Sequence, residues 1–433
     1  MEMLKFDLNK AGQKFKILNA TNGGPWHKRH TDGQNQSNFE AYKAARIPYS
    51  RNHDSGVVSV YGGPYSHDIT KIFPFFDADV HAPESYDFPC TDESVLVTLD
   101  AGTQTFFRLG QTIEHHVVKH GANPPKDFQK WAEICEHIIR HYNQGWANGF
   151  ELGMEYWEIW NEPDVKGGGC WTGTDEQFFD LFETAAKHLK KCFPNIKIGG
   201  PAIAFDVEWG ERFLKEMQAR GVELDFFSWH CYCTEPNKMM ARATQVREMM
   251  NHYGYGNAES ILNEWNYVKG WTDEYIYSIQ TMHGIKGATF TMACISEAQK
   301  NDGIDMLMYY DTRPSVFCGA FDFYTTLPLK GYYPLYWYGM FYDLTAEIRC
   351  ENQPEKIYTL CGKDEQGKVM CIVTYYDDHD ENAPSKEVNI DFGKEGKYEI
   401  YLLDAEHDGT FAEITDNLTF KMDVCSSILI KEV

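Results

Sequence analysis

The sequence lacks the features that bind nucleic acid, span a membrane or form a disulfide framework. Lys and Arg number 40 against 64 Asp and Glu, and the net charge of −24 would repel polyanionic partners. No apolar run is long enough to span a bilayer, and residues 1–7 show no apolar run after a basic segment. The 12 cysteines include no C-x-x-C pair. We therefore expect a cytoplasmic protein with reduced thiols, no secretion signal and no nucleic-acid or membrane partner.

The motifs of nucleotide and metal sites are also missing. The first predicted strand is followed by Gly23-Gly24-Pro25, which does not have the G-x-G-x-x-G spacing of a dinucleotide-binding turn. Leu18-Asn19-Ala20 stands where barrel metallohydrolases carry His-x-His. His137 and His141 lie four residues apart, but no cysteine or carboxylate completes a recognised zinc spacing. The sequence therefore predicts no cofactor and no metal.

Strands alternate with helices over residues 8–345, and this pattern predicts a parallel sheet with helical crossovers. The clearest helix begins near Pro125 and repeats apolar residues at helical spacing from Trp131 to Tyr142. Strands are predicted over residues 15–20, 45–53, 105–110, 155–162, 196–202, 224–232, 260–267 and 287–295. Helices are predicted over residues 36–45, 91–101, 125–142, 174–192, 208–220, 236–253, 272–285 and 334–344. Eight such units favour an α/β fold of the (β/α)8 TIM-barrel type over a doubly wound sheet.

The pattern changes after residue 345. Residues 346–433 consist of short, alternating, β-branched runs separated by Gly, Asp and Asn. Such runs are typical of a small antiparallel β-sandwich. Residues 1–7 also alternate, and we expect them to join this accessory domain.

Two carboxylates stand at predicted strand ends, where barrel enzymes carry their chemistry. Glu162 follows Asn161 at the end of the fourth strand and precedes Pro163, and Glu264 lies on the seventh strand. One protonated and one ionised carboxyl group across a pocket is what acetal hydrolysis requires. Their separation distinguishes retention, at about 5–5.5 Å, from inversion, at about 6.5–9.5 Å. The alternative is a buried strand with an incidental acid at its end.

These residues carry a resemblance to a known family. Trp160-Asn161-Glu162-Pro163, paired with Asn263-Glu264-Trp265, resembles the clan of retaining (β/α)8 glycosidases. The whole chain is similar to glycoside hydrolase family 39, which holds β-xylosidases, α-L-iduronidases and some arabinosidases. The resemblance implies a covalent glycosyl-enzyme intermediate, with Glu162 as acid/base and Glu264 as nucleophile. It also implies that Asn161 binds the sugar 2-hydroxyl, and that the site contains His230, Tyr232, Arg51 and His53.

Other candidate residues have plain structural alternatives. Four residues fall in strand-end loops as candidate sugar platforms, with ordinary loop packing as the alternative: Trp26, His27, Trp171 and Tyr310. Arg108 could pair with Glu158 inside the barrel or contact a sugar.

The strongly acidic chain favours a neutral pentose over a uronic acid as the sugar. We therefore expect an exo-acting, metal-independent, β-xylosidase-like enzyme that acts on a glycoside or oligosaccharide. An arabinosidase, an α-L-iduronidase-like enzyme and a non-catalytic carbohydrate-binding barrel are the alternatives. A homo-oligomer is possible.

Overall fold

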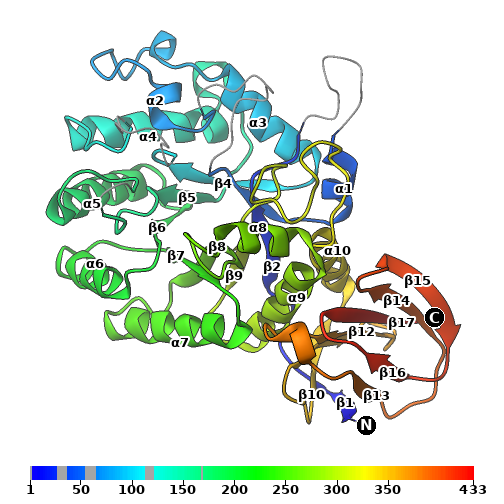
Figure 1. The fold of residues 1–433 in the computed structure, drawn as a ribbon. Coiled ribbons are helices and arrows are strands. Elements are labelled where there is room, and N and C mark those ends of the chain that lie inside the picture. The colour runs from blue at the N-terminus through cyan, green and yellow to red at the C-terminus, as the bar shows by residue number, and fades with distance from the viewer. Residues whose placement is uncertain (1, 27–36, 54–64, 113–120, 167–168) are drawn as a thin grey trace.

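The computed structural model describes residues 2–26, 37–53, 65–112, 121–166 and 169–433 (Figure 1). Eight parallel strands close into a barrel, with β9 pairing back onto β2 so that Thr21 lies opposite Tyr309. The barrel strands are β2 (Ile17–Asn22), β3 (Tyr49–Arg51), β4 (Gln104–Leu109), β5 (Tyr156–Ile159), β6 (Lys197–Ile203), β7 (Phe226–Cys233), β8 (Glu259–Tyr267) and β9 (Met306–Tyr309). The predicted TIM barrel is confirmed.

Helices surround the barrel. The helix that the sequence predicts most clearly, α4, begins after a capping aspartate and ends at a glycine. Asp127 accepts a hydrogen bond from the Lys130 backbone at the start of α4, and Gly145 ends that helix in the left-handed conformation. The α-helices are α1 (Phe39–Ala44), α2 (Ile69–Ile72), α3 (Pro89–Asp100), α4 (Phe128–Gln144), α5 (Asp175–Cys192), α6 (Val207–Ala219), α7 (Pro236–His252), α8 (Tyr275–His283), α9 (Ile285–Lys300) and α10 (Tyr332–Met340). Short 3-10 turns cover Pro83–Ser85, Trp146–Asn148, Phe341–Asp343 and Asp380–Asn382.

One predicted strand is wrong. Residues 287–295 form part of α9, and the eighth barrel strand is β9, further along the chain. Helix α9 is buried almost all round, because it lies between the barrel and the C-terminal sheet (Figure 1). A helix without a polar face shows no helical periodicity in its sequence, so its apolar run looks like a strand.

The C-terminal strands form one curled, nine-stranded sheet in the order β15-β14-β17-β12-β11-β10-β1-β13-β16. Its strands are β1 (Glu2–Ala11), β10 (Ala346–Cys350), β11 (Ile357–Lys363), β12 (Val369–Tyr375), β13 (Lys386–Asp391), β14 (Tyr398–Leu403), β15 (Asp408–Thr415), β16 (Thr419–Met422) and β17 (Ser426–Glu432). Leu4 of β1 and Ile390 of β13 share a hydrophobic core with Cys371 and Val373 of β12, which lies in another part of the sheet. The arrangement is therefore sandwich-like, and mostly antiparallel as predicted.

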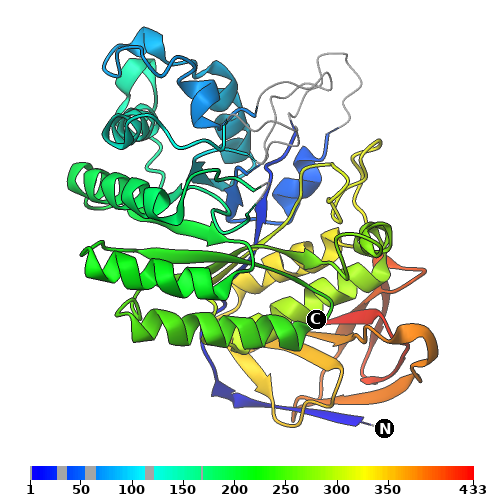
Figure 2. The same ribbon diagram turned by 60° about the vertical axis from the view of Figure 1, so that its left-hand side comes forward.

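Strand β1 connects the first residues of the chain to this sheet. It pairs antiparallel with β10 and parallel with β13, and it runs beside them in Figure 2. The domain boundary at residues 345–346 stays a prediction. No helix in the described ranges is long and apolar enough to cross a membrane.

Candidate active site

The backbone after β5 turns sharply where the predicted acid stands. Trp160 and Glu162 have φ angles of 72° and 45°, in the left-handed region that residues other than glycine rarely adopt. The turn is held by hydrogen bonds from the Trp160 N–H to Leu109 O at 2.8 Å and from the Glu162 N–H to Ala202 O at 2.9 Å. Strained backbone of this kind is concentrated at functional sites, where it aims a side chain. Here it brings the Glu162 side chain over the carboxyl ends of the strands.

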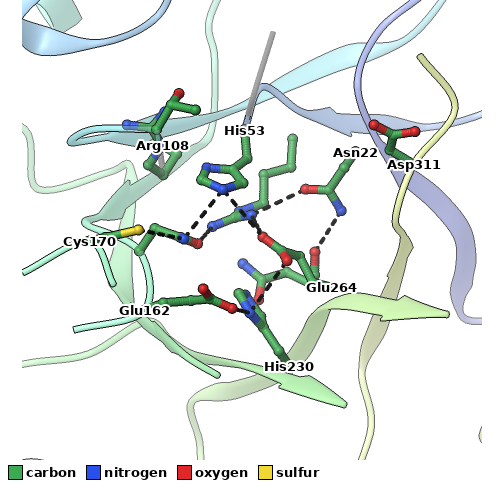
Figure 3. A network of polar contacts seen from close by, with 12 residues as sticks. Asn22, His53, Arg108, Glu162, Cys170, His230, Glu264 and Asp311 are labelled. Atoms are coloured by element: carbon green, nitrogen blue, oxygen red, sulfur yellow. Dashed lines mark hydrogen bonds and ion pairs between the residues drawn. The ribbon is translucent and has the colours of Figure 1, made fainter. Parts of the chain in front are cut away.

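Glu162 and Glu264 meet on either side of His230, as Figure 3 shows. Nδ1 of His230 lies 2.8 Å from Oε1 of Glu162 and 3.5 Å from Oε2 of Glu264. One oxygen of each carboxyl group lies within 4.8 Å of the other. Burial is the main cause that lowers the pKa of His230 below its ordinary value, so the ring is neutral near pH 7. His230 therefore adds no cation between the two acids.

Arg51 and Tyr232 bind the carboxylate of Glu264. Nη1 of Arg51 donates to Oε1 at 2.7 Å, and the hydroxyl of Tyr232 donates to Oε2 at 2.9 Å. Burial lowers the pKa of Arg51, but Glu158 and Glu264 outweigh it and raise that pKa above its ordinary value. Burial, and then the charge of Glu264, raise the pKa of Tyr232 well above 10. Both groups therefore remain donors, which favours an ionised Glu264.

Glu158, inside the barrel, holds Arg51 in place. Oε2 of this fully buried glutamate accepts from Nε of Arg51 at 2.7 Å, while Oε1 accepts from Ser228 and Asn263 at 2.6 Å each. Asn22 also accepts from Arg51, at 3.2 Å. Asn22 and Glu158 were not predicted as site residues, although a charged residue in a buried strand signals a required partner.

Arg108 forms a structural ion pair, one of the two alternatives considered for it, but its partner is Asp68 and not Glu158. The two residues are neighbours in the register of β4 and β5, but Arg108 instead donates to Oδ1 of Asp68 at 2.9 Å. Asp68 directly precedes α2, a short helix in the long segment between β3 and β4. Glu158 pairs with Arg51 instead, and Arg51 in turn connects it to Glu264.

Asn161 is oriented by its neighbours. Its Oδ1 accepts from Nη2 of Arg51 at 2.6 Å, which places its NH₂ group 3.3 Å from Nε2 of His53 and 3.5 Å from Sγ of Cys170 (Figure 3). Burial holds the pKa of His53 well below its ordinary value, so its neutral ring can accept from Asn161. Nε2 of His53 also lies 3.8 Å from Glu264. The structure thus brings seven of the predicted site residues together: Arg51, His53, Asn161, Glu162, His230, Tyr232 and Glu264.

The predicted sugar platforms differ in position. The Tyr310 ring lies 6.5 Å from that of His53 and 6.4 Å from that of Tyr232, at the edge of the cluster. Trp26 follows β2, and its backbone N–H donates to Oδ1 of Asn38 at 2.8 Å. Trp171 is buried against Trp160, at 4% exposure, and belongs to the core. A platform role stays a prediction for Trp26 and Tyr310, and His27 lies outside the described residues.

Two groups of side chains among the described residues have the composition of metal ligands. One is the cluster of Glu162, His230 and Glu264, and the other is Glu136 of α4 with His188 and Cys192 of α5. His137 and His141 do not form such a group: Nδ1 of His137 lies 2.7 Å from the carbonyl oxygen of Glu133, and His141 contacts Asp92 at 3.0 Å. That the chemistry needs no metal stays a prediction.

An eight-stranded barrel with two facing carboxylates at the strand ends is the arrangement of a glycoside hydrolase. Residues 43–298 match the model of glycosyl hydrolases family 39, and the chain belongs to this family.

Two curated relatives are named as β-xylosidases. The one from Caldicellulosiruptor saccharolyticus is 30% identical over 161 residues, which cover 35% of this chain and 32% of that protein. The one from Geobacillus stearothermophilus is 32% identical over 184 residues, which cover 40% of this chain and 36% of that protein. The matched part spans about a third of the length of these relatives.

Solved structures show the same fold over the whole chain. A glucosidase from Croceicoccus marinus superposes with a TM-score of 0.82 at 20% identity, covering 100% of this chain and 99% of the other. A family 39 β-xylosidase from Caulobacter crescentus superposes with a TM-score of 0.72 at 15% identity, covering 100% of both chains.

Proposed function

We propose that the protein is a retaining glycoside hydrolase, with Glu264 as nucleophile and Glu162 as acid/base. The observation that carries this proposal is the short separation of the two acids, whose nearest oxygens lie within 4.8 Å. Retaining enzymes place their carboxyl groups about 5–5.5 Å apart, whereas inverting enzymes leave about 6.5–9.5 Å for a water molecule. The geometry favours the covalent route.

In the first step, Glu264 attacks the anomeric carbon of the sugar. Hydrogen bonds from Arg51 and Tyr232 keep this carboxylate ionised and aimed. The bond to the leaving oxygen breaks, and that oxygen takes the proton of Glu162. Two negative charges at this distance would repel each other, so the ionised Glu264 favours a protonated Glu162.

In the second step, water releases the sugar. Glu162 is now a carboxylate, and because Glu264 is esterified its charge no longer opposes that of Glu162. Glu162 removes a proton from water, the water oxygen bonds to the anomeric carbon, and Glu264 leaves as a carboxylate. Two inversions give net retention. For Asn161, whose Oδ1 accepts from Arg51, we propose that its NH₂ donates to the sugar 2-hydroxyl.

For the sugar we propose a neutral pentose, with exo action of the β-xylosidase kind. The curated relatives named as β-xylosidases support this choice. The charges of the two fully buried arginines support it too: Arg51 is neutralised by Glu158 and Glu264, and Arg108 by Asp68. A uronic carboxylate would compete with these internal partners. An arabinosidase or an iduronidase-like enzyme would use the same two acids.

A panel of aryl glycosides tests the proposal. We expect turnover of an aryl xyloside, with the first product released in the anomeric configuration of the substrate, as followed by proton NMR. Glu264→Ala should reduce kcat by about 10³-fold or more while the fold is kept. Exposed Glu223→Ala is the control and should retain full activity. A first product of opposite configuration would rule out Glu264 as nucleophile, and sugar binding without any turnover would favour the non-catalytic barrel.

We also propose that the protein works in a reducing compartment. Each of the 12 cysteines has a free thiol, and Cys135, Cys294, Cys361 and Cys371 are packed in hydrophobic cores. Thiol labelling of the protein denatured directly from its cells should find all of them reduced; a disulfide would contradict this.

A further inference from the structure

A row of aromatic rings leads outward from the nucleophile. The hydroxyl of Tyr232 binds Glu264, and the ring of Tyr232 meets Trp271 edge-on, with centroids 5.1 Å apart and planes at 81°. Trp271 in turn stacks on Phe317, at 5.9 Å and 25°. Phe317 also lies 5.8 Å from Tyr310 and 5.9 Å from Tyr275, so several rings hold it in place. We call Tyr232, Trp271, Phe317 and Tyr310 the aromatic wall.

Trp271 is the outer member of this wall and is largely open to solvent. It lies in the segment between β8 and α8, and 56% of its surface is exposed although its ring contacts two other aromatic rings. Phe317 covers one face of the indole and Tyr232 meets it edge-on. A supported indole with an open side offers a flat apolar surface in water, and such a surface gains free energy when a flat partner covers it.

The position of Trp271 indicates which part of a substrate it would meet. In the described part of the chain, the inner end of the site consists of buried side chains: Arg51, Asn161 and His53 are at most 2% exposed. The sugar that is attacked must enter this inner end, because its anomeric carbon has to lie between Glu162 and Glu264. An exposed ring on the outer side of Tyr232 can then contact only the group beyond the scissile bond.

We propose that Trp271, supported by Phe317, forms a binding site for the leaving-group sugar, and that the preferred substrate is a short oligosaccharide rather than a simple alkyl glycoside. The C–H groups on one face of a pyranose ring form the flat apolar partner that the indole lacks. This inference rests on the proposed hydrolysis, since it names the leaving-group side of the same site. It makes Trp271 a specificity residue that acts without touching the reacting atoms.

Two substrates with the same glycone and different leaving groups test this site. We would compare xylobiose with methyl β-xyloside, or the corresponding pair for whichever sugar the aryl panel selects. In Trp271→Ala, we expect kcat/KM for the disaccharide to fall about tenfold or more, and kcat/KM for the methyl glycoside to change less than about twofold. Trp271→Phe should restore part of the loss, because it keeps a flat ring.

The controls separate this site from stability and from the reaction itself. Phe411→Ala removes an aromatic side chain of similar exposure, 50%, from β15 and should change neither substrate. An equal loss on both substrates, or no loss on either, would overturn the leaving-group site while the hydrolysis stands. A wild-type protein that turns over no glycoside would overturn the proposed hydrolysis and this site with it.

Discussion

The hydroxyl of Tyr232 donates a hydrogen bond of 2.9 Å to Oε2 of Glu264. Because burial and the neighbouring carboxylate raise the pKa of this tyrosine well above its ordinary value, the hydroxyl keeps its proton near neutral pH. Together with Arg51 on the other oxygen, it fixes the carboxylate in one orientation.

Removing this hydroxyl should slow the reaction without changing its alkaline pH dependence. A hydrogen bond to a charged group contributes about 1.5–3 kcal/mol, so Tyr232→Phe should lower kcat by about 10- to 100-fold. The alkaline limb of the pH–rate profile should stay where it is in the wild type. Tyr401→Phe is a matched control, since the Tyr401 hydroxyl donates to Glu399 over 3.0 Å in the C-terminal sheet. An alkaline limb that moves in Tyr232→Phe would mean that this tyrosine titrates.

Replacing the acid should make the rate depend on the leaving group. In Glu162→Ala no proton reaches the leaving oxygen, so glycosides with poor leaving groups should lose about 10²–10⁴-fold in kcat/KM. A dinitrophenyl glycoside, whose leaving group needs no proton, should lose far less. The measurement is kcat/KM across a series of phenols of increasing pKa. Equal losses across the series would contradict the acid role.

Removing the charge of Glu158 should destabilise the fold as well as the site. Glu158→Gln leaves Arg51 buried with one carboxylate fewer, and breaking a buried ion pair costs about 3–5 kcal/mol. Denaturant unfolding should show this loss, and kcat should fall because Arg51 also orients Glu264. As control, Asp343→Asn breaks the exposed pair with Arg46 and should cost less than about 1 kcal/mol. A Glu158→Gln protein of wild-type stability would show that Arg51 is held by its other partners.

Buried histidines should make the protein sensitive to acid. Burial lowers the pKa of His67 to about 3, whereas the same side chain titrates near 6.5 in the unfolded chain. At a pH between these two pKa values, His67 binds a proton in the unfolded chain but not in the folded protein. His67 therefore contributes stability that is complete above about pH 6.5 and is lost as the pH falls, by up to about 1.4 kcal/mol per pH unit.

The slope of stability against pH measures this effect. His67→Gln should flatten the acid side of the curve, whatever it does to stability at neutral pH. Exposed His252→Gln is the control and should leave the slope unchanged. His53 and His230, whose pKa values burial also lowers, add to the acid sensitivity in the same direction.

The barrel was predictable from sequence because helices such as α4, α5 and α6 have one polar and one apolar side. Helix α4 shows its apolar face at helical spacing and carries both of its terminal signals. Helix α9 has no such face, since it is covered by the barrel on one side and by β11, β12 and β17 on the other. The burial of α9 depends on contacts with distant parts of the chain, and the pattern of apolar residues within the helix does not show those contacts.

The site was predictable to the extent that its residues stand at strand ends. Glu162, which follows β5, and Glu264, which lies within β8, could be singled out because each is an acid beside an apolar stretch and next to an asparagine. Glu158 and Arg108 could be singled out as charged residues in buried strands, but their partners could not: the strand register makes them neighbours, while the side chains pair with Arg51 and Asp68. Trp271 carries no local signal, because only the fold brings it against Tyr232.

The pairing of β1 has a consequence for biosynthesis. This strand precedes the barrel in the chain, yet its partners β10 and β13 begin more than 300 residues after it, at Ala346 and Lys386. Until those strands have been translated, β1 has unpaired backbone edges and α9 lacks the sheet that covers it. The residues of the barrel therefore leave the ribosome before the strands that complete this sheet and cover α9 have been made. The accessory sheet can therefore form only after β10 and β13 have been translated, although one of its strands precedes the whole barrel in the chain.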